Sequence, residues 1–154
     1  MHLYLVRHGD AVPEEEDRLR PLSERGREEV ARVARTVARF GLGAVVVHHS
    51  GKLRAKQTAE ILAAELDVHG APTPMDGLAP NHDPLIAVAF TETMDLPTML
   101  VGHLPHLSRL CSLLVLGQPG PELVAFPPGA MVALSRRLDG GWRIDWVVTP
   151  ATAR

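Results

Sequence analysis

Short runs of apolar residues alternate along the chain with longer segments in which apolar residues recur at helical spacing. Uninterrupted apolar runs of this kind are typical of strands in a parallel sheet that is covered on both faces. The apolar runs are residues 3–6, 44–47 and 99–101. The segments with helical spacing, in which apolar residues follow i, i+3, i+4 and i+7, are residues 23–40, 52–66 and 105–115. The pattern therefore predicts parallel strands that are joined by helices.

The last third of the chain departs from this alternation. Residues 83–90 predict one more short helix, and residues 130–138 and 142–149 predict two strands. Asp139-Gly140-Gly141 separates these two strands and is typical of a hairpin turn, so at least one strand runs antiparallel. We expect a single α/β domain over residues 1–154, folded as a three-layer α/β/α sandwich whose mostly parallel sheet ends in a C-terminal antiparallel hairpin.

Composition narrows the classes of protein that fit this fold. The 154 residues suffice for one domain with a core, and 45% of them are apolar while 22% are charged, as in an ordinary globular protein. A formal net charge of −2 gives no basic surface for nucleic acid or for an anionic membrane. Cys111 is the only cysteine, so no disulfide is expected, and no Cys/His spacing predicts a metal site or a cofactor. The N-terminus has no signal peptide, and we expect a cytoplasmic location.

Basic side chains follow each of the three predicted parallel strands. Arg7, His8 and Gly9 come directly after the first strand, Arg54 opens the helix after the second, and His103 follows the third. Ligands of such sheets bind outside the carboxyl ends of the strands, so these side chains are expected to meet at one edge. Two guanidinium groups and helix N-termini at this edge predict a site for a small dianion such as phosphate.

Imidazole groups at a phosphate site predict phosphoryl transfer. A neutral histidine with one ring nitrogen held by a backbone carbonyl presents the other nitrogen as a nucleophile. His8 is the better candidate, because it lies beside Arg7 and because Gly9 is expected to leave room for the approach of the substrate. His103, when protonated, is expected to stabilise charge on the phosphoryl oxygens. A flavodoxin-like or receiver-like domain would carry acidic residues at these strand ends instead.

Four short motifs occur in the order and spacing of a known family. "VRHGDA", "RPLSERG", "LRAKQTAE" and "VGHLPHLS" together resemble the histidine phosphatase superfamily, the phosphoglycerate mutase-like or RHG group. The resemblance extends nearly to Leu116, and the compact length is similar to that of the SixA-type phosphohistidine phosphatases. It implies that His8 is the phosphorylated nucleophile, that Arg7 and Arg54 bind phosphate and that His103 completes the pocket. It also implies a two-step reaction through a phosphohistidine intermediate, followed by hydrolysis.

Two departures from the family pattern bear on the substrate. Gly51 follows Ser50 where relatives usually carry proline, and the segment 76–90, which in larger relatives is a long insert with a carboxylic acid, is short here. Asp83 is our candidate proton donor in this segment, with Asp76 behind it. An imidazole leaving group needs an acid less than an alkoxide does, so a protein phosphohistidine is favoured as the phosphorylated substrate. A general small-molecule phosphomonoesterase and a non-catalytic phosphate-binding or phosphohistidine-binding module remain as alternatives.

The roles of several other charged or titratable side chains stay open. One of the two histidines after the second strand either lines the pocket or is structural, and an arginine of the loop before the first helix either reaches the phosphate or is solvated. His106 is expected on the surface or on the pocket rim. These residues are His48, His49, Arg18, Arg20 and His106.

Overall fold

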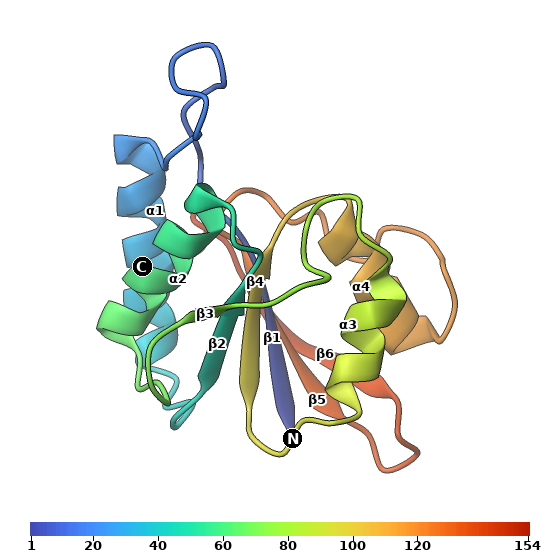
Figure 1. Ribbon diagram of the computed structural model, residues 1–154. Helices are drawn as coiled ribbons and strands as arrows, with labels where there is room; N and C mark the ends of the chain where they lie inside the picture. Colours follow the sequence, from blue (N-terminus) through green and yellow to red (C-terminus); the bar gives the residue numbers. More distant parts are fainter.

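A computed structural model describes all residues 1–154 and contains one six-stranded sheet with four helices (Figure 1). The strands are β1 (His2–Arg7), β2 (Val46–His49), β3 (Thr73–Pro74), β4 (Thr98–Gly102), β5 (Met131–Arg136) and β6 (Trp142–Val148). The helices are α1 (Glu24–Ala38), α2 (Leu53–Glu65), α3 (Pro84–Thr91) and α4 (His106–Leu116). Every predicted helix and strand is confirmed, whereas the two-residue strand β3 was not predicted.

The sheet order is β3-β2-β4-β1-β5-β6, which places the first strand of the chain in the interior of the sheet. β1 pairs in parallel with β4, β4 with β2, and β2 with β3. β5 is antiparallel to β1, and β6 is antiparallel to β5. The prediction of a mostly parallel sheet with a C-terminal antiparallel hairpin is therefore confirmed.

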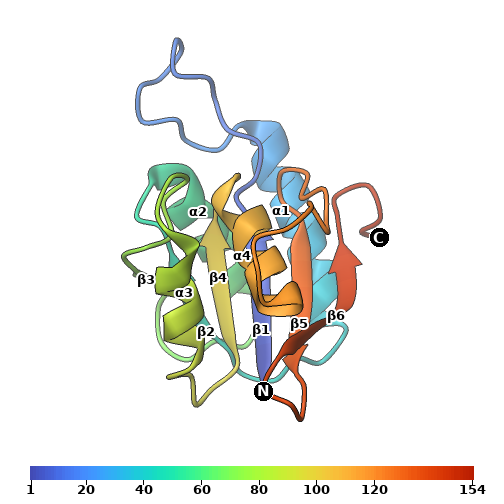
Figure 2. The same cartoon turned by 90° about the vertical axis from the view of Figure 1, so that its right-hand side faces the viewer.

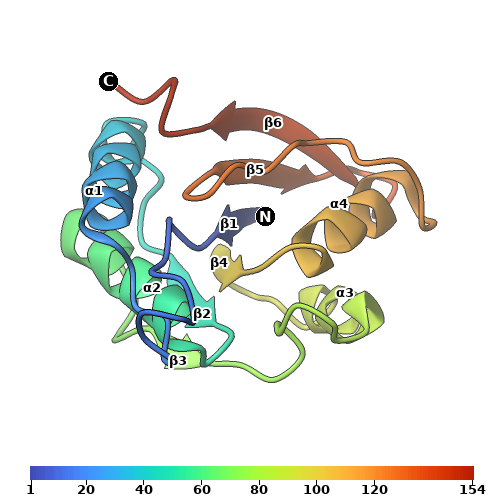
Figure 3. The same ribbon diagram turned by 90° about the horizontal axis from the view of Figure 1, so that it is seen from above.

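Helices cover both faces of the sheet, α1 and α2 on one side and α3 and α4 on the other (Figure 3). Because successive side chains of a strand point to opposite faces, β1 contributes to both cores. Tyr4 and Val6 pack toward α1 and α2, while Leu3 and Leu5 pack toward α3 and α4. The position of β1 is thus fixed by two separate apolar cores as well as by two neighbouring strands.

Local hydrogen bonds set where the helices begin. Ser23 caps α1, its Oγ accepting a hydrogen bond of 3.0 Å from the backbone N–H of Gly26, and Asp83 caps α3 through the backbone N–H of Leu85. α4 ends at Gly117, whose φ of 76° lies in the left-handed region that glycine adopts without strain. The Ser23 cap fixes where α1 begins, and so fixes the end of the loop that joins β1 to α1.

Residues 11–22, between β1 and α1, form an arm that stands out beyond the end of the sheet at which β1 and β4 finish (Figures 1 and 2). A bridge between Ala11 and Leu22 closes its base, and the backbone N–H of Val12 donates to the carbonyl of Pro21 at 2.8 Å. No helix of the structure has the length and apolar character needed to cross a membrane.

Candidate active site

The parallel strands bring three separate parts of the chain to one edge of the sheet. Arg7 at the end of β1 lies in register with Gly102 at the end of β4, and His49 at the end of β2 lies in register with Val101. His8 and His103 follow these strands directly, so their rings lie side by side with 4.9 Å between centroids. The sheet therefore brings together two histidines that are far apart in the sequence.

The orientation of His8 is fixed by the backbone. Its Nδ1 lies 2.7 Å from the carbonyl oxygen of Gly9, and its own backbone N–H donates to the carbonyl of Gly102 at 3.0 Å. Because a carbonyl oxygen only accepts hydrogen bonds, the proton of the neutral ring resides on Nδ1 and leaves Nε2 with a free lone pair. Burial, together with the charges of nearby arginines, lowers the pKa of His8 to about 4. His8 is thus a neutral imidazole at pH 7.

The guanidinium groups of Arg7 and Arg54 have only some of their hydrogen-bond donors paired within the protein. Nη1 of Arg7 donates to the carbonyl of Phe126 at 2.9 Å, whereas the Nε atoms of both Arg7 and Arg54 are buried without a hydrogen-bond partner. Burial lowers the pKa of both guanidinium groups, yet arginine stays protonated. Buried charged donors without partners are costly, and a bound oxyanion would satisfy them.

The 11–22 arm contributes a third arginine. Arg20 has a φ of 49°, in the left-handed region, and its Nε donates to the carbonyl of Val12 at 3.1 Å. Its charge contributes to the lowered pKa of both His8 and Arg54, so it lies close enough for its charge to act on them. Arg18 is exposed on the arm. Of the two arginines left open by the sequence, Arg20 is the one that acts on the site.

His103 makes a hydrogen bond that the sequence did not reveal. Its Nε2 lies 2.6 Å from the Oγ of Ser50, while its Nδ1 is buried without a partner. Burial, and next the neighbouring ring of His8, lower the pKa of His103 to about 2. Both imidazoles are therefore uncharged while the site contains no anion, and a bound dianion would favour protonation of His103.

Thr58 joins two parts of the site and was missed by the sequence analysis. Its buried Oγ1 accepts from the backbone N–H of Gly9 at 3.1 Å and donates to the carbonyl of Arg54 at 2.8 Å. The available signal was its spacing in "LRAKQTAE", because a residue four positions after Arg54 lies on the same helix face. A single hydroxyl group thus connects the turn after His8 with the first turn of α2.

Gly9 differs from its expected role. A Cβ at this position would lie 2.7 Å from Cγ2 of Val30 and 3.1 Å from the carbonyl oxygen of Gly26, both in α1. The missing side chain therefore lets α1 pack against the segment after β1, and does not make room for the substrate as predicted. Gly26 is tighter still, because a Cβ there would lie 2.1 Å from the carbonyl oxygen of Asp10.

The structure shows the surroundings of three histidines whose roles the sequence left open, which are His48, His49 and His106. Nδ1 of His49 accepts from the backbone N–H of Gly51 at 3.0 Å, and His48 packs its ring edge-on against Phe90. His106 was expected on the surface or the rim, but its ring is fully buried and neither nitrogen has a hydrogen-bond partner. Its position in the first turn of α4 turns it under the loop before α3 instead of outward. Burial lowers the pKa of His106 to about 4.

The predicted proton donor lies at the edge of this region. Asp83 accepts a hydrogen bond of 3.0 Å from the backbone N–H of Leu85, and its charge acts on the pKa of His106. The charged groups that most strongly affect the pKa of His8 and of His103 are all basic. Asp76 is exposed in the same loop. The role of Asp83 as a proton donor stays a prediction.

No group of three His, Cys, Asp or Glu side chains is placed to hold a metal ion.

Comparison with known sequences identifies the family. The sequence profile of the histidine phosphatase superfamily (branch 1) matches residues 3–79, which is half of the chain. The chain belongs to this superfamily. Membership supports a phosphatase activity and implies a phosphorylated substrate. A protein of Picosynechococcus sp. that is described as uncharacterised is 38% identical over 131 residues, which cover 80% of this chain and 78% of that protein.

Solved structures show the same fold as this histidine phosphatase. The protein histidine phosphatase SixA complexed with tungstate superposes with a TM-score of 0.84 at 24% identity, over 98% of both chains. A SixA protein from Agrobacterium tumefaciens superposes with a TM-score of 0.74 at 22% identity, over 97% of both chains. At these identities the similarity establishes the fold, and the substrate has to be argued from the site itself.

Proposed function

We propose that this protein hydrolyses protein phosphohistidine through a covalent phosphoryl intermediate on His8. The observation that carries the proposal is the 2.7 Å contact between Nδ1 of His8 and the carbonyl of Gly9, which holds the ring in the tautomer whose Nε2 is free to attack. The low pKa of His8 keeps that nitrogen unprotonated at neutral pH. No activation by a separate base is needed.

In the first step, Nε2 of His8 attacks the phosphorus atom of the substrate. The substrate ring carries a proton on the nitrogen that does not hold the phosphoryl group. A new P–N bond forms to His8 while the P–N bond to the substrate ring breaks, and that ring keeps the electron pair of the broken bond and so departs as neutral imidazole. Arg7, Arg54 and Arg20 offset the charge of the phosphoryl oxygens as this group moves. Because all three remain charged, the transferring group is held throughout the step.

In the second step, water attacks the phosphorus atom of phospho-His8. The P–N bond to His8 breaks, inorganic phosphate is released and Nε2 regains its lone pair. His103 lies beside His8, and a proton that it gains when the dianion binds stabilises the developing charge. Ser50 orients this ring through its 2.6 Å contact with Nε2.

The charges around the two imidazoles favour phosphohistidine over an alcohol phosphate. The groups that most strongly affect the pKa of His8 and His103 are basic, and the nearest candidate acid, Asp83, acts on His106 instead. An alkoxide leaves poorly without a proton donor, whereas a protonated imidazole leaves readily. The same SixA-like fold in a protein histidine phosphatase supports this choice.

The test compares a histidine-phosphorylated phosphocarrier domain with a panel of sugar, nucleotide and glycerate phosphates as substrates. We expect preferential release of phosphate from the carrier, transient acid-labile label on the wild-type enzyme and no turnover by His8→Ala. His48→Ala is the matched control, because His48 is also a histidine near the end of a strand, but its ring packs against Phe90, whereas the rings of His8 and His103 lie against each other. A clear preference for a metabolite would overturn the substrate, and binding without phosphate release would indicate a non-catalytic module.

Asp83 is tested separately, since we retain it as the proposed proton donor for alcohol leaving groups. Asparagine also caps helices, so Asp83→Asn removes the acid while α3 stays capped. We expect this variant to lose turnover of an alkyl phosphate and to keep turnover of phosphohistidine. Equal turnover of the alkyl phosphate by both proteins would remove Asp83 from the mechanism.

A further inference from the structure

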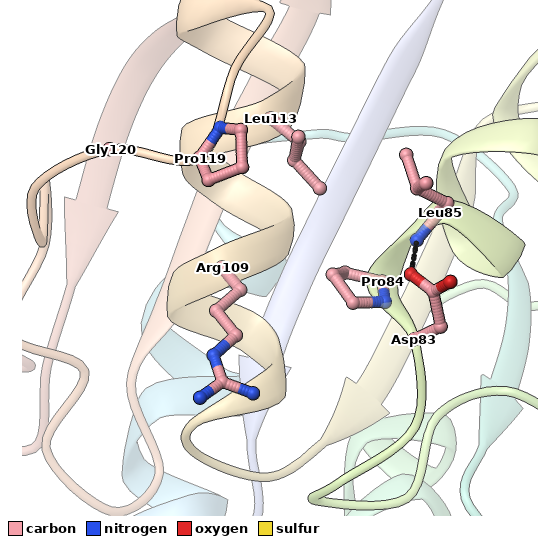
Figure 4. Close-up of a pocket in the computed structure, with 7 residues that line it drawn as sticks. All are labelled: Asp83, Pro84, Leu85, Arg109, Leu113, Pro119 and Gly120. Carbon is pink, nitrogen blue, oxygen red and sulfur yellow. Dashed lines mark hydrogen bonds between the residues drawn. The ribbon is translucent and has the colours of Figure 1, made fainter.

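The largest groove of the molecule lies outside the phosphate pocket, between α3 and α4 (Figure 4). It encloses about 470 Å³ and is bounded by the start of α3, one side of α4 and the turn that follows α4. Its walls are mainly apolar and include Leu85, Leu113 and Pro119. Leu85 is 56% exposed, which is high for a leucine that belongs to a helix with a buried face.

The groove has one charged end. Asp83 and Arg109 both line it there, and Figure 4 shows them near the beginnings of α3 and α4, with the Asp83 carboxylate turned toward the backbone N–H of Leu85 and with Leu113 and Pro119 farther along the groove. Neither side chain forms an ion pair: Asp83 only caps its own helix, and Arg109 is exposed. An unpaired guanidinium beside an apolar groove fits an acidic residue that is flanked by apolar ones.

The charged end of the groove is continuous with the active site. α4 begins at His106, three residues after His103, so Arg109 lies one helical turn further from the pocket. The loop before α3 also borders the site, because the carbonyl oxygen of Leu78 would lie 3.4 Å from a Cβ placed at Gly102. A molecule that fills the phosphate pocket and extends over this rim meets the groove next.

A phosphohistidine substrate has to extend over the rim. An imidazole side chain is short, so the backbone that carries it comes close to the mouth of the pocket, and the surrounding protein contacts the enzyme there. On the opposite side, the 11–22 arm offers mainly acidic side chains from Glu14 to Asp17. The groove is the part of this rim where an apolar surface can be buried.

We propose that the α3–α4 groove docks an amphipathic helix of the histidine-phosphorylated protein, with an acidic residue of that helix opposite Arg109. This proposal rests on the proposed function. A groove between two helices suits a third helix that inserts apolar residues at i, i+3 and i+4. A substrate that must leave after each turnover requires a transient complex, and a contact confined to one groove suits such a complex.

The test measures steady-state kinetics of Leu85→Glu and Arg109→Gln with a histidine-phosphorylated phosphocarrier domain and with p-nitrophenyl phosphate. We expect each variant to raise KM for the carrier about tenfold, with kcat unchanged and with unchanged kinetics on the small substrate. Glutamate in the first turn of α3 is compatible with folding, because it suits the helix dipole. The matched controls are Leu138→Glu and Arg143→Gln on the β5–β6 hairpin, because neither residue lines the groove and Leu138 is fully exposed.

Each outcome separates the two proposals. If the wild-type enzyme does not dephosphorylate the carrier, the proposed function fails and the docking site fails with it. If the wild type is active and both groove variants equal it, only the docking site is overturned. If Leu85→Glu instead converts a wild-type dimer into a monomer in sedimentation, the groove joins two copies of this chain and the docking proposal is wrong.

Discussion

The phosphate pocket and the α3–α4 groove lie next to each other and are built in opposite ways. In the pocket, His8 and His103 are buried and cationic side chains surround them. In the groove, the walls are apolar, Leu85 is largely exposed and the charges of Asp83 and Arg109 are unpaired. Transfer of a phosphoryl group requires charges that are fixed before the reaction, whereas recognition of a protein surface does not. In our proposals, the difference separates the part that performs the chemistry from the part that selects the partner.

The largest expected effect follows from removing one charge of the pocket. Arg54→Ala should lower kcat/KM about 10³-fold on both protein and small substrates, because a fixed charge on the transferring group is lost. Arg54→Lys keeps the charge without the planar donor fork and should recover only part of the activity. A loss of activity confined to the protein substrate would show that Arg54 acts in docking, and the separation between a chemical pocket and a docking groove would be wrong.

The next effect concerns the close packing behind the pocket. Gly26→Ala should lower the free energy of unfolding by about 3 kcal/mol, because its Cβ would meet the carbonyl oxygen of Asp10 at 2.1 Å. Gly141→Ala is the control, since its Cβ would meet only the side-chain oxygen of Asp139 at 3.2 Å. Chemical denaturation of both variants measures the difference. Equal stability of the two variants would show that the backbone around Asp10 can shift to accept a side chain at position 26, and the prediction would be wrong.

Acid should lower the free energy of unfolding through His106, which lies between the pocket and the groove. The pKa of His106 is about 4 in the folded protein and near 6.5 in the unfolded chain, so the unfolded chain takes up the proton first as the pH falls. The stability that neutral His106 contributes is complete above pH 6.5 and is lost as the pH falls toward 4, by about 2 kcal/mol at pH 5. Denaturation at several pH values should show a weaker pH dependence for His106→Leu. Replacement of the exposed His69 by leucine is the control.

The smallest expected effect sharpens the role of a single hydrogen bond. Ser50→Ala removes the 2.6 Å contact with His103 and should lower kcat/KM about tenfold, as the loss of one hydrogen bond to a catalytic ring predicts. Ser50→Thr keeps a hydroxyl group and should retain most of the activity. The Oγ of Ser50 also accepts a hydrogen bond of 3.3 Å from the backbone N–H of Lys52, but Ser50 does not line the α3–α4 groove, so the loss should be equal for protein and small substrates.

The arrangement of helices and strands could be predicted because its signals are local. Uninterrupted or alternating apolar residues mark the strands and helical spacing marks the helices, except for β3, which consists only of Thr73 and Pro74. Two residues are too few to show a period, and proline is atypical inside a sheet although it is tolerated at an edge. This strand forms because His48 and His49 offer it a partner, and a partner distant in the sequence leaves no local pattern.

The candidate site could be predicted in part for a similar reason. Arg7, His8 and His103 follow strand ends, and the parallel order of those strands determines that they meet. The burial of His106 and the effect of the Arg20 charge on the pKa of His8 depend on how loops fold back over the sheet. Loop paths depend on tertiary contacts and not on the period of the sequence, which explains why these two residues were left open or misplaced.

The interior position of β1 has a consequence for synthesis of the chain. β1 is made first, yet its neighbours are β4, which ends at Gly102, and β5, which ends at Arg136. A ribosome-bound chain that lacks β5 leaves one edge of β1 unpaired, and the segment with Phe126, whose carbonyl accepts from Arg7, lies directly before β5. His8, the nucleophile of the proposed reaction, is therefore among the first residues to be translated, whereas β5, which completes the pairing of β1, is among the last strands.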